Sequence, residues 1–339
     1  MPGRALSGAF IGFGAVAENG HLPGWRTLNQ AAIVAAADAM PARREAFLRA
    51  APGARAYESA AELLARERLD FVDICTPPAS HAELIARALE VPLHVLCEKP
   101  LATRLADAEG AARTASRAAR VVHTVHNWLE APILRHVSAL LSEDAIGSLR
   151  RVRWSTLRRG PAAASGAGAN WRTDPTLAGG GILLDHGWHA LYCVTRWLGR
   201  PPSAVAASLE TRRYREWALE DTATLALDFG SAAADIHLSW AADERASRIE
   251  LEGERGRIEV AGERIILEGP SGKRSWSHPP PLSEGSHHPD WFAGVAAEFR
   301  AAVLAGKSGN LEEALLCARL IDLAQRSSAA GGARLELEP

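Results

Sequence analysis

The chain has 339 residues, of which 47% are hydrophobic, and a formal net charge of −2. This length exceeds what one ordinary core supports, so we expect two domains, and the hydrophobic fraction argues against disorder. The near-neutral charge predicts no nucleic-acid surface, and no apolar run approaches the roughly 20 residues that cross a bilayer, so no membrane partner is expected.

The four cysteines are scattered through the chain without a CxxC pair. Cys75 and Cys97 lie in apolar, strand-like segments, which is typical of free buried thiols in a reducing compartment. The first residues lack the apolar core of a signal peptide. We therefore expect a cytoplasmic protein.

A glycine-rich motif follows the first apolar strand, Leu6–Gly12. The residues from Gly12 to Ala17 read GFGAVA and match the GxGxx[GA] pattern of a dinucleotide-binding turn. Gly12 permits the tight turn, Gly14 lets the backbone approach a pyrophosphate, and the small Ala17 allows helix and strand to pack closely. The predicted cofactor contacts are Gly12, Phe13, Gly14, Ala15 and Val16.

The second strand, Ala32–Ala37, ends in Asp38. An acid at this place can accept both ribose hydroxyls of an adenosine, which favours NAD over NADP. The alternative is an N-cap for the helix that begins at Pro41. Arg43 and Arg44 leave room for a 2′-phosphate.

Strand-like and helical segments then alternate as far as His126. Strands are expected at Phe71–Cys75, Val95–Cys97 and Val121–Val125, and helices at Pro41–Ala50, Ser59–Arg68, Ser80–Leu89 and Leu105–Ala119. Ser80 followed by Glu83 predicts a capping box. The alternation predicts an α/β domain over residues 1–126, a Rossmann-type doubly wound parallel sheet.

The strand over Val95–Cys97 ends abruptly in Glu98, Lys99 and Pro100. Proline cannot continue a strand, so Lys99 is held at the carboxyl end, where open α/β sheets bind ligands. A lysine there can donate a hydrogen bond to a substrate oxygen or act as an acid. The alternative is an ordinary surface lysine behind a buried strand.

The second half of the chain alternates like an antiparallel sheet. The expected strands are Leu149–Arg158, Ser203–Leu209, Asp221–Phe229, Ala233–Trp240, Arg248–Glu252, Arg257–Val260 and Arg264–Leu267. Helices are expected at Pro132–Leu141, Trp291–Leu304 and Leu311–Ser327, and a mobile loop at Gly160–Asn170. We predict an α+β domain over residues 127–339 with a large, mostly antiparallel open sheet.

Asp185 and His189 follow a run of three glycines, Gly179–Gly181. If helical, they share one face and can act on one ligand, and the glycines leave room for its approach. The alternative is a capping aspartate and a packed histidine. The histidines near the loop Ser277–Pro289 have no fixed spacing to a cysteine or carboxylate, so no metal site is predicted.

Four segments together resemble the Gfo/Idh/MocA family of NAD(P)-dependent oxidoreductases across nearly the whole chain. They are GFGAVA with Asp38, DFVDICTPPASHAELIARALE, VLCEKPLA and GGGILLDHGWHALYCVTRWLG. The resemblance implies that Lys99, Asp185 and His189 form the catalytic group. It also implies cofactor contacts from Thr76, Pro77, His81, Glu98, Lys99 and Asn127, and substrate contacts from Lys99, Trp171, Arg172, Asp185 and His189. One departure is the His-Asn-Trp sequence at residues 126–128, where many members have an Asn-Arg pair.

The chemistry expected is hydride transfer between NAD and a secondary carbinol or carbonyl of a sugar, polyol or inositol-like substrate. His189 is the candidate base for the hydroxyl proton, Asp185 orients the imidazole or relays a proton to it, and Lys99 donates to the same oxygen. Two alternatives are an NAD-dependent glycosidase, which oxidises only transiently, and a noncatalytic cofactor-sensing regulator.

The side chains on one face of the expected antiparallel sheet indicate that the protein associates with its own copy. On two strands this face carries Thr222, Thr224, Ala226, Asp228, Asp235, His237 and Ser239, with no lysine or arginine among them. Solvated sheet faces usually carry longer charged groups, so we expect it to meet its own copy in a homodimer or homotetramer. The alternative is an ordinary solvated face.

Overall fold

A computed structural model describes residues 5–163 and 170–338, which form two compact units. The first unit takes in residues up to Asn127 and Ser286–Leu315, and the second takes in Trp128–Ala163, Asn170–Gly285 and Leu316 onward. The division predicted at residue 126 assigned 286–315 to the second domain. These residues belong with the first because Phe292 and Phe299 pack in its core. The predicted loop Gly160–Asn170 falls largely on 164–169, outside the described residues.

The first unit contains a six-stranded parallel sheet with the order β3-β2-β1-β4-β5-β6. The strands are β1 Leu6–Ile11, β2 Ala31–Ala37, β3 Arg55–Tyr57, β4 Phe71–Ile74, β5 His94–Cys97 and β6 Val122–Thr124. The order reverses at β1, as in a doubly wound Rossmann-type sheet. This confirms the fold predicted for the first part of the chain.

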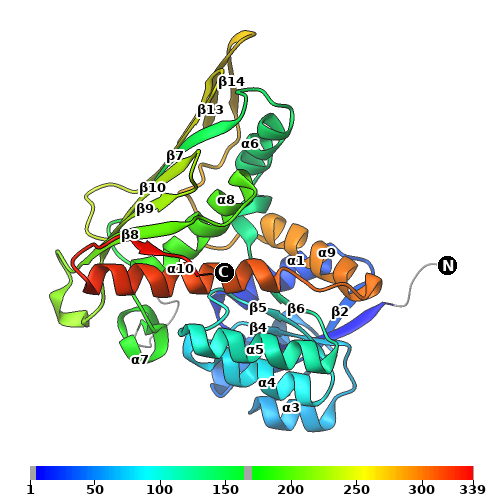
Figure 1. Ribbon diagram of the computed structural model, residues 1–339. Helices are drawn as coiled ribbons and strands as arrows, with labels where there is room; N and C mark the ends of the chain where they lie inside the picture. Colours follow the sequence, from blue (N-terminus) through cyan, green and yellow to red (C-terminus); the bar gives the residue numbers. More distant parts are fainter. Residues whose placement is uncertain (1–4, 164–169, 339) are drawn as a thin grey trace. The chain divides into compact units, whose positions relative to one another are not determined.

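Helices cover both faces of this sheet (Figure 1). They are α1 Leu22–Arg26, α2 Pro41–Ala50, α3 Ala60–Arg66, α4 His81–Glu90, α5 Leu105–Ala118 and α9 Pro289–Ala305. In Figure 1, α3, α4 and α5 lie together on one face, whereas α1 and α9 lie on the other. Trp25 of α1 and Phe299 of α9 pack against Phe71 of β4, with ring centroids 4.8 and 5.4 Å from that of Phe71. This aromatic cluster fixes α9 to the sheet.

The second unit contains a nine-stranded sheet with the order β14-β13-β12-β11-β7-β10-β9-β8-β15. The strands are β7 Leu149–Leu157, β8 Ala204–Glu210, β9 Thr222–Asp228, β10 Ala233–Ser239, β11 Ala246–Gly253, β12 Arg257–Ala261, β13 Arg264–Gly269, β14 Gly272–Ser277 and β15 Leu335–Glu336. The neighbours β7 and β10 are parallel and the other pairs are antiparallel. The predicted mostly antiparallel open sheet is thus confirmed.

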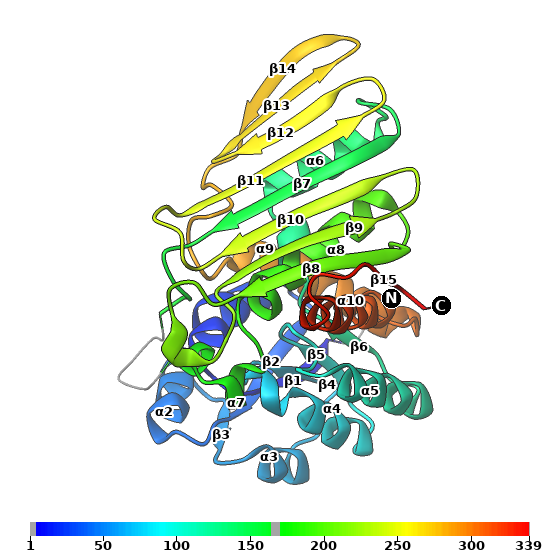
Figure 2. The same ribbon diagram turned by 60° about the vertical axis from the view of Figure 1, so that its left-hand side comes forward.

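Helices lie along one face of the second sheet (Figure 2). They are α6 Pro132–Ser142 and α8 Trp188–Leu198, together with the later part of α10, Leu311–Ala329, whose Ser327 and Ser328 contact β8. The short helix α7, Pro175–Ala178, lies away from this face. Figure 2 shows α6 and α8 behind the strands, with the opposite face of the sheet toward the viewer. Alternate residues such as Ala223, Leu225 and Leu227 of β9 are buried toward the helices. The uncovered face therefore presents the other set of side chains.

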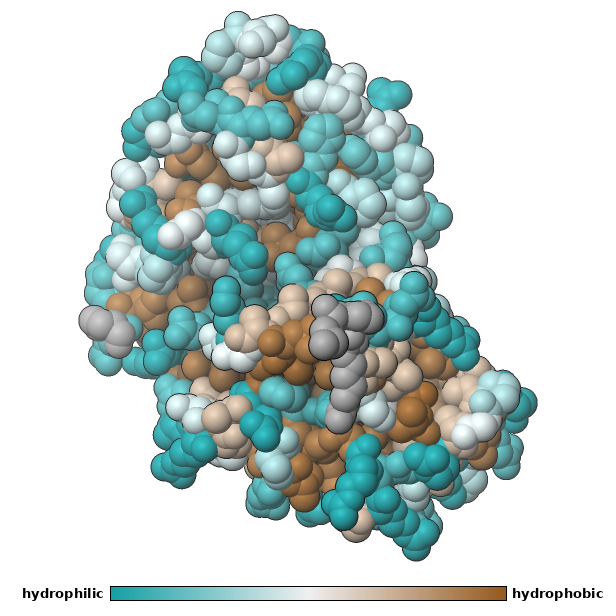
Figure 3. Space-filling view, turned by 90° about the vertical axis from the view of Figure 1, so that its right-hand side faces the viewer, coloured by the Kyte–Doolittle hydropathy of each residue, from teal (hydrophilic) through white to brown (hydrophobic). Residues whose placement is uncertain are grey.

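Two smaller features concern the helix ends and the surface. Ser80 stands at the N-cap of α4 as predicted, but its hydroxyl faces Thr76 Oγ1 and Pro77 O and caps no helix N–H, so the predicted capping box is wrong. Figure 3 shows a face on which hydrophobic and hydrophilic side chains are mixed, and among the described residues few large hydrophobic side chains are strongly exposed. No helix in the described part of the chain is long and apolar enough to cross a membrane.

Candidate active site

Four neighbouring strands of the first sheet end at the same level. Ile11 of β1 pairs with Ile74 of β4, Ile74 with Cys97 of β5, and Cys97 with Thr124 of β6. The segments that follow these strands therefore share one edge of the sheet, the carboxyl edge where such folds bind ligands. These segments contain the candidate residues Gly12, Thr76, Pro77, Glu98, Lys99 and Asn127.

The glycine turn after β1 has two different requirements. Gly12 has φ +86°, and a Cβ there would lie 2.8 Å from Thr76 Cγ2, so both conformation and space demand glycine. A Cβ on Gly14 would meet no described atom within 4 Å. Gly14 thus leaves open space at the turn, as a closely approaching ligand would need. Ala17 is fully buried at the start of a π-helical turn, Ala17–His21.

The carboxylate of Asp38 braces the glycine turn. Its Oδ2 accepts the Phe13 N–H at 2.8 Å, and its Oδ1 accepts the Met40 N–H at 2.9 Å. The N-cap of α2 is Met40, so Asp38 is not the capping residue of that helix. The Phe13 side chain is fully buried, with its ring 5.0 Å from that of Phe47. Phe13 therefore offers a ligand its backbone and not its ring.

The Thr76 loop is tied down by His81, the first residue of α4. His81 is fully buried, with Nδ1 2.7 Å from Pro100 O and Nε2 2.9 Å from Thr76 O. Burial lowers the pKa of His81, so the ring is neutral at pH 7 and donates only one of these two contacts. Its ring supports the loop that contains Thr76 and Pro77. The direct cofactor contact of His81 stays a prediction.

Glu98 and Lys99 form the turn after β5. The Lys99 N–H donates to Glu98 Oε2 at 2.9 Å, and Glu98 Oε1 lies 3.0 Å from His21 Nε2. Burial would raise the pKa of Glu98, but its hydrogen bond to His21 and the charges of His21 and Lys99 hold that pKa below its usual value. The Glu98 carboxylate is therefore ionised at neutral pH next to the Lys99 backbone.

Asn127 follows β6 at the same edge. Its side-chain oxygen, Oδ1, is buried and has no hydrogen-bond partner among the described residues. The strand before it is held by Asn310, whose amide donates to Thr124 O and accepts the Thr124 N–H at 2.8 and 2.7 Å. His126 Nδ1 lies 2.9 Å from Glu313 Oε2. An acceptor such as Asn127 Oδ1 fits a ligand that offers a donor.

In the second unit, the glycine run serves the backbone rather than a ligand. Gly179 has φ +75° and ends α7, and a Cβ on Gly181 would lie 1.9 Å from the backbone oxygen of Glu220. Glu220 Oε1 accepts the N–H groups of Gly181 and Leu183 at 2.9 and 3.1 Å. The expectation that these glycines leave room for a substrate is thus replaced by a packing role at Gly179 and Gly181.

Asp185 lies in a π-helical turn, Leu183–Gly187, which precedes α8. Its Oδ2 is 3.8 Å from Arg172 Nε and 3.3 Å from His186 Nδ1, and Arg172 stacks on Trp171 with its guanidinium carbon 4.2 Å from the ring centroid. The second unit therefore brings three predicted substrate residues together: Trp171, Arg172 and Asp185. Single π-turns inside α-helices occur frequently at functional sites.

His189 is held by aromatic neighbours from the same unit. The side chain is buried, its ring stacks on Trp128 with centroids 4.7 Å apart, and its Nδ1 is 2.8 Å from Tyr192 Oη. The Trp128 N–H also donates to Tyr192 Oη, at 3.0 Å. If Nδ1 donates its proton to Tyr192, Nε2 carries the lone pair of the neutral ring and can act as a base. Tyr192 and Trp128 thus help to fix the ring plane, and the orienting role expected of Asp185 stays a prediction.

Several site residues were absent from the sequence prediction. Asp73 is a buried acid within an otherwise apolar strand, which was the one signal available for it, because such a group needs a buried partner. His21, Tyr192 and Glu220 carried no local signal, since their contacts depend on chain segments far away in sequence.

Two family models match the chain. The oxidoreductase family with an NAD-binding Rossmann fold matches residues 6–126, and the GFO/IDH/MocA C-terminal domain matches residues 134–259. A D-apiose dehydrogenase from Paraburkholderia graminis is 30% identical over 84% of this chain and 75% of its own length. A D-glucoside 3-dehydrogenase from Escherichia coli is 28% identical over 59% of this chain and 56% of its own length.

A solved structure has the same fold over nearly the whole chain. An oxidoreductase from Agrobacterium radiobacter, in complex with NAD+, L-tartaric acid and magnesium, has a TM-score of 0.87 and 26% identity, covering 98% of both chains. A levoglucosan dehydrogenase in complex with NADH and levoglucosan has a TM-score of 0.85 at 20% identity, which shows the fold alone.

Proposed function

Because the chain belongs to the Gfo/Idh/MocA family of NAD-binding sugar oxidoreductases, we propose that it oxidises a secondary carbinol of a sugar, polyol or inositol-like substrate, or reduces the corresponding ketone. The observation that carries this proposal is the common strand edge on which the glycine turn, the Thr76 loop and Lys99 lie. The dehydrogenases among its relatives support a sugar as substrate.

The nucleotide would lie along this edge. The open space at Gly14 and the backbone of the turn fit a pyrophosphate. Asn127 Oδ1, which has no hydrogen-bond partner among the described residues, fits a donor on the cofactor or substrate. When bound, NAD supplies the hydride acceptor. The protein's own residues bind and orient the substrate and the cofactor, and they move the proton.

The proton chemistry is assigned to three side chains. His189 Nε2 takes the hydroxyl proton, because its other nitrogen faces Tyr192. Lys99 donates a hydrogen bond to the same substrate oxygen as it becomes a carbonyl oxygen. Asp185, which pairs with Arg172 and His186, holds a substrate hydroxyl in place or balances the positive charge beside it.

A substrate panel tests this function. Purified enzyme with NAD is mixed with aldopentoses that include D-apiose, with glucosides, levoglucosan, inositols and linear polyols, and NADH absorbance is followed. We expect at least one of these compounds to give net NADH and a ketone or lactone product by mass spectrometry. Release of a sugar leaving group without net NADH would instead indicate an NAD-dependent glycosidase, and a failure of every compound to react would support a regulator.

Cofactor preference provides a separate prediction. A 2′-phosphate next to the Asp38 carboxylate is repelled, so kcat/KM with NAD should exceed that with NADP by about tenfold or more, equivalent to about 1.4 kcal/mol. Asp38→Ser should narrow this ratio, whereas Asp107→Ser on the exposed surface of α5 should leave it unchanged. Equal or better use of NADP by the wild-type enzyme would refute the assignment and point to Arg43 or Arg44.

The uncovered face of the second sheet supports a further proposal, that the chain forms a homodimer or homotetramer. Small side chains are contiguous across β8, β9 and β10, because Ala206 pairs with Ala226, and Thr224 pairs with both Ser208 and His237. Thr222 and Ser239, predicted on this face, are instead buried, with their hydroxyls 3.0 Å apart. The face is also more charged than expected at its β7 side, where Arg151 pairs with Asp235.

Thr224→Arg tests the assembly. The exposed Thr224 lies within the small-residue area of this face, so an arginine there would be buried without a partner in the oligomer and should weaken it strongly. Light scattering at micromolar concentration should give a multiple of the chain mass for wild type and for the control Ser116→Arg, and a lower mass for Thr224→Arg. A monomeric wild-type protein would contradict the proposal.

A further inference from the structure

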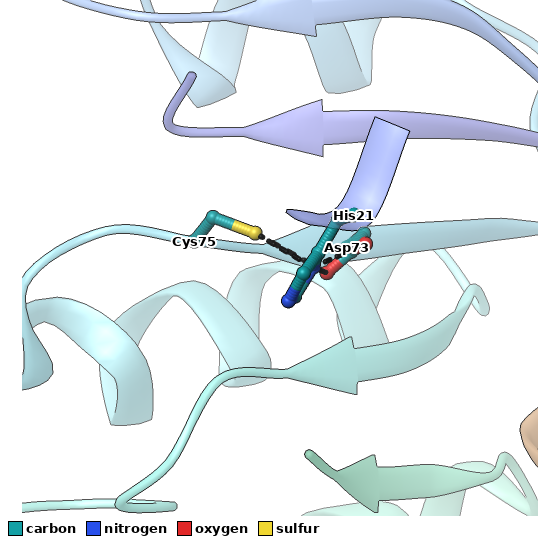
Figure 4. A group of neighbouring side chains, drawn as sticks. All are labelled: His21, Asp73 and Cys75. Carbon is teal, nitrogen blue, oxygen red and sulfur yellow. Dashed lines mark hydrogen bonds and ion pairs between the residues drawn. The ribbon is translucent and has the colours of Figure 1, made fainter. Parts of the chain in front are cut away.

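An acid is buried in the middle of the first sheet. Asp73 of β4 has no exposed surface, although its strand is otherwise apolar. Its Oδ2 accepts the Trp25 Nε1–H at 2.8 Å. The same oxygen lies 3.0 Å from His21 Nδ1, and Cys75 Sγ is 3.4 Å from Oδ1 (Figure 4). A buried carboxylate without such partners would be strongly destabilising. Trp25, His21 and Cys75 therefore supply the polar partners that this buried carboxylate needs.

His21 joins this acid to the Lys99 turn. Its Nδ1 faces Asp73, its Nε2 is 3.0 Å from Glu98 Oε1, and its ring stacks on Phe292 with centroids 3.7 Å apart. Each ring nitrogen thus faces a carboxylate. Only the imidazolium can donate to both.

The charges around His21 favour this protonated form. Burial lowers the pKa of His21, but the Asp73 and Glu98 carboxylates outweigh it through charge and hydrogen bonds, and the pKa rises to about 9. The other group in contact, Cys75, has a pKa raised well above its usual value by burial and by the charges of Asp73 and Glu98. It remains a neutral thiol that can donate to Asp73.

We propose that His21 is a charged positioning residue, whose imidazolium links Asp73 to Glu98 and so fixes the Lys99 turn at the end of β5. The link is continuous, because Glu98 uses Oε1 for His21 and Oε2 for the Lys99 N–H. This inference rests on the proposed function, which gives Lys99 its catalytic role. Without His21, the Glu98 carboxylate would lose its charged partner and the freedom of the turn would increase.

A metal ion is the competing occupant. His21 Nδ1, an Asp73 oxygen and Cys75 Sγ lie close enough to one another to hold one. A metal would have to deprotonate Cys75 and take the place of the His21 Nδ1 proton that faces Asp73. The Trp25 donor also already occupies Asp73 Oδ2. The contacts therefore fit a protonated His21 better than a bound metal ion.

Nitrogen-15 NMR of the histidine side chains tests the charge directly, on the full-length enzyme saturated with NAD. The signal lost in His21→Gln identifies this residue among the twelve histidines. We expect an imidazolium at pH 7 that titrates near pH 9, and a lower midpoint in Asp73→Asn. A neutral ring at pH 7, or stoichiometric zinc in the purified enzyme by elemental analysis, would overturn the proposal.

Kinetics separate positioning from general stability. His21→Gln should lower kcat about ten- to a hundredfold while KM for NAD changes only a few-fold, because a misplaced group costs mainly turnover. In Asp73→Asn the alkaline fall of kcat should move to lower pH, together with the NMR midpoint. The control His123→Gln removes another buried histidine of the same unit and should not move this fall.

Two results would contradict the inference in different ways. An unchanged pH profile in Asp73→Asn, with kcat losses that follow only the melting temperature, would reduce His21 to a structural role. Normal turnover of Lys99→Met alongside a charged His21 would instead remove the proposed function of Lys99 and leave the charge assignment standing.

Discussion

Lys99→Met should lower kcat at least about a hundredfold, because it removes a charged donor from the oxygen on which charge changes during hydride transfer. Methionine keeps much of the length and apolar volume of the lysine stem. The Lys99 backbone, through which Glu98 holds the turn, is unchanged by the substitution. NAD binding, measured by quenching of tryptophan fluorescence, should therefore stay within a few-fold of wild type.

Lys307→Met is the matched control for this prediction. Lys307 is an exposed lysine of the same unit, just beyond α9, and its replacement should leave kcat and NAD binding unchanged. If Lys99→Met is folded, binds NAD and turns over at a near-normal rate, Lys99 does not belong to the catalytic group.

His189→Asn should lower kcat by about 10²–10⁴, the usual contribution of a positioned general base. Asparagine retains a polar side chain but cannot take up the proton. The loss should be smaller at high pH, where hydroxide substitutes for the missing base. Rates measured across a pH series for wild type and variant would show this convergence.

Tyr192→Phe and His136→Asn complete the series. Tyr192→Phe removes the hydroxyl that faces His189 Nδ1, so it should lower kcat less than His189→Asn and shift the acidic limb of the pH profile. His136→Asn changes a histidine on α6 that contacts His278 and should leave kcat unaltered. An acidic limb that is identical in wild type and His189→Asn would assign the base to another group.

Periodicity and turn chemistry predicted most of the fold. Alternating strands and helices over the first 126 residues were sufficient to predict the parallel sheet. Apolar alternation located both ends of each strand from β7 to β13 to within two residues. The missed strands were short or lacked a pattern. Arg55–Tyr57 spans three residues, Leu335–Glu336 two, and Gly272–Ser277 has no apolar alternation.

The candidate site was predicted unevenly, for a physical reason. Motifs written in consecutive residues, such as the glycine turn and the Glu98-Lys99-Pro100 turn, could be placed because strand ends fix them locally. The contacts of His21 with Asp73 and Glu98 join residues 52 and 77 positions apart, so they exist only after the sheet and helices pack. The π-turn at Asp185 likewise departs from the regular helix that the sequence predicted.

The destination of the carbinol hydrogen tests the central claim most directly. A substrate found in the panel is prepared with deuterium on its reacting carbon, and NADH and product are analysed by mass spectrometry. The account predicts one deuterium in each NADH for each ketone or lactone formed, together with a slower chemical step. Product formation with no deuterium in NADH, or cleavage of the sugar with the label retained in it, would contradict the account.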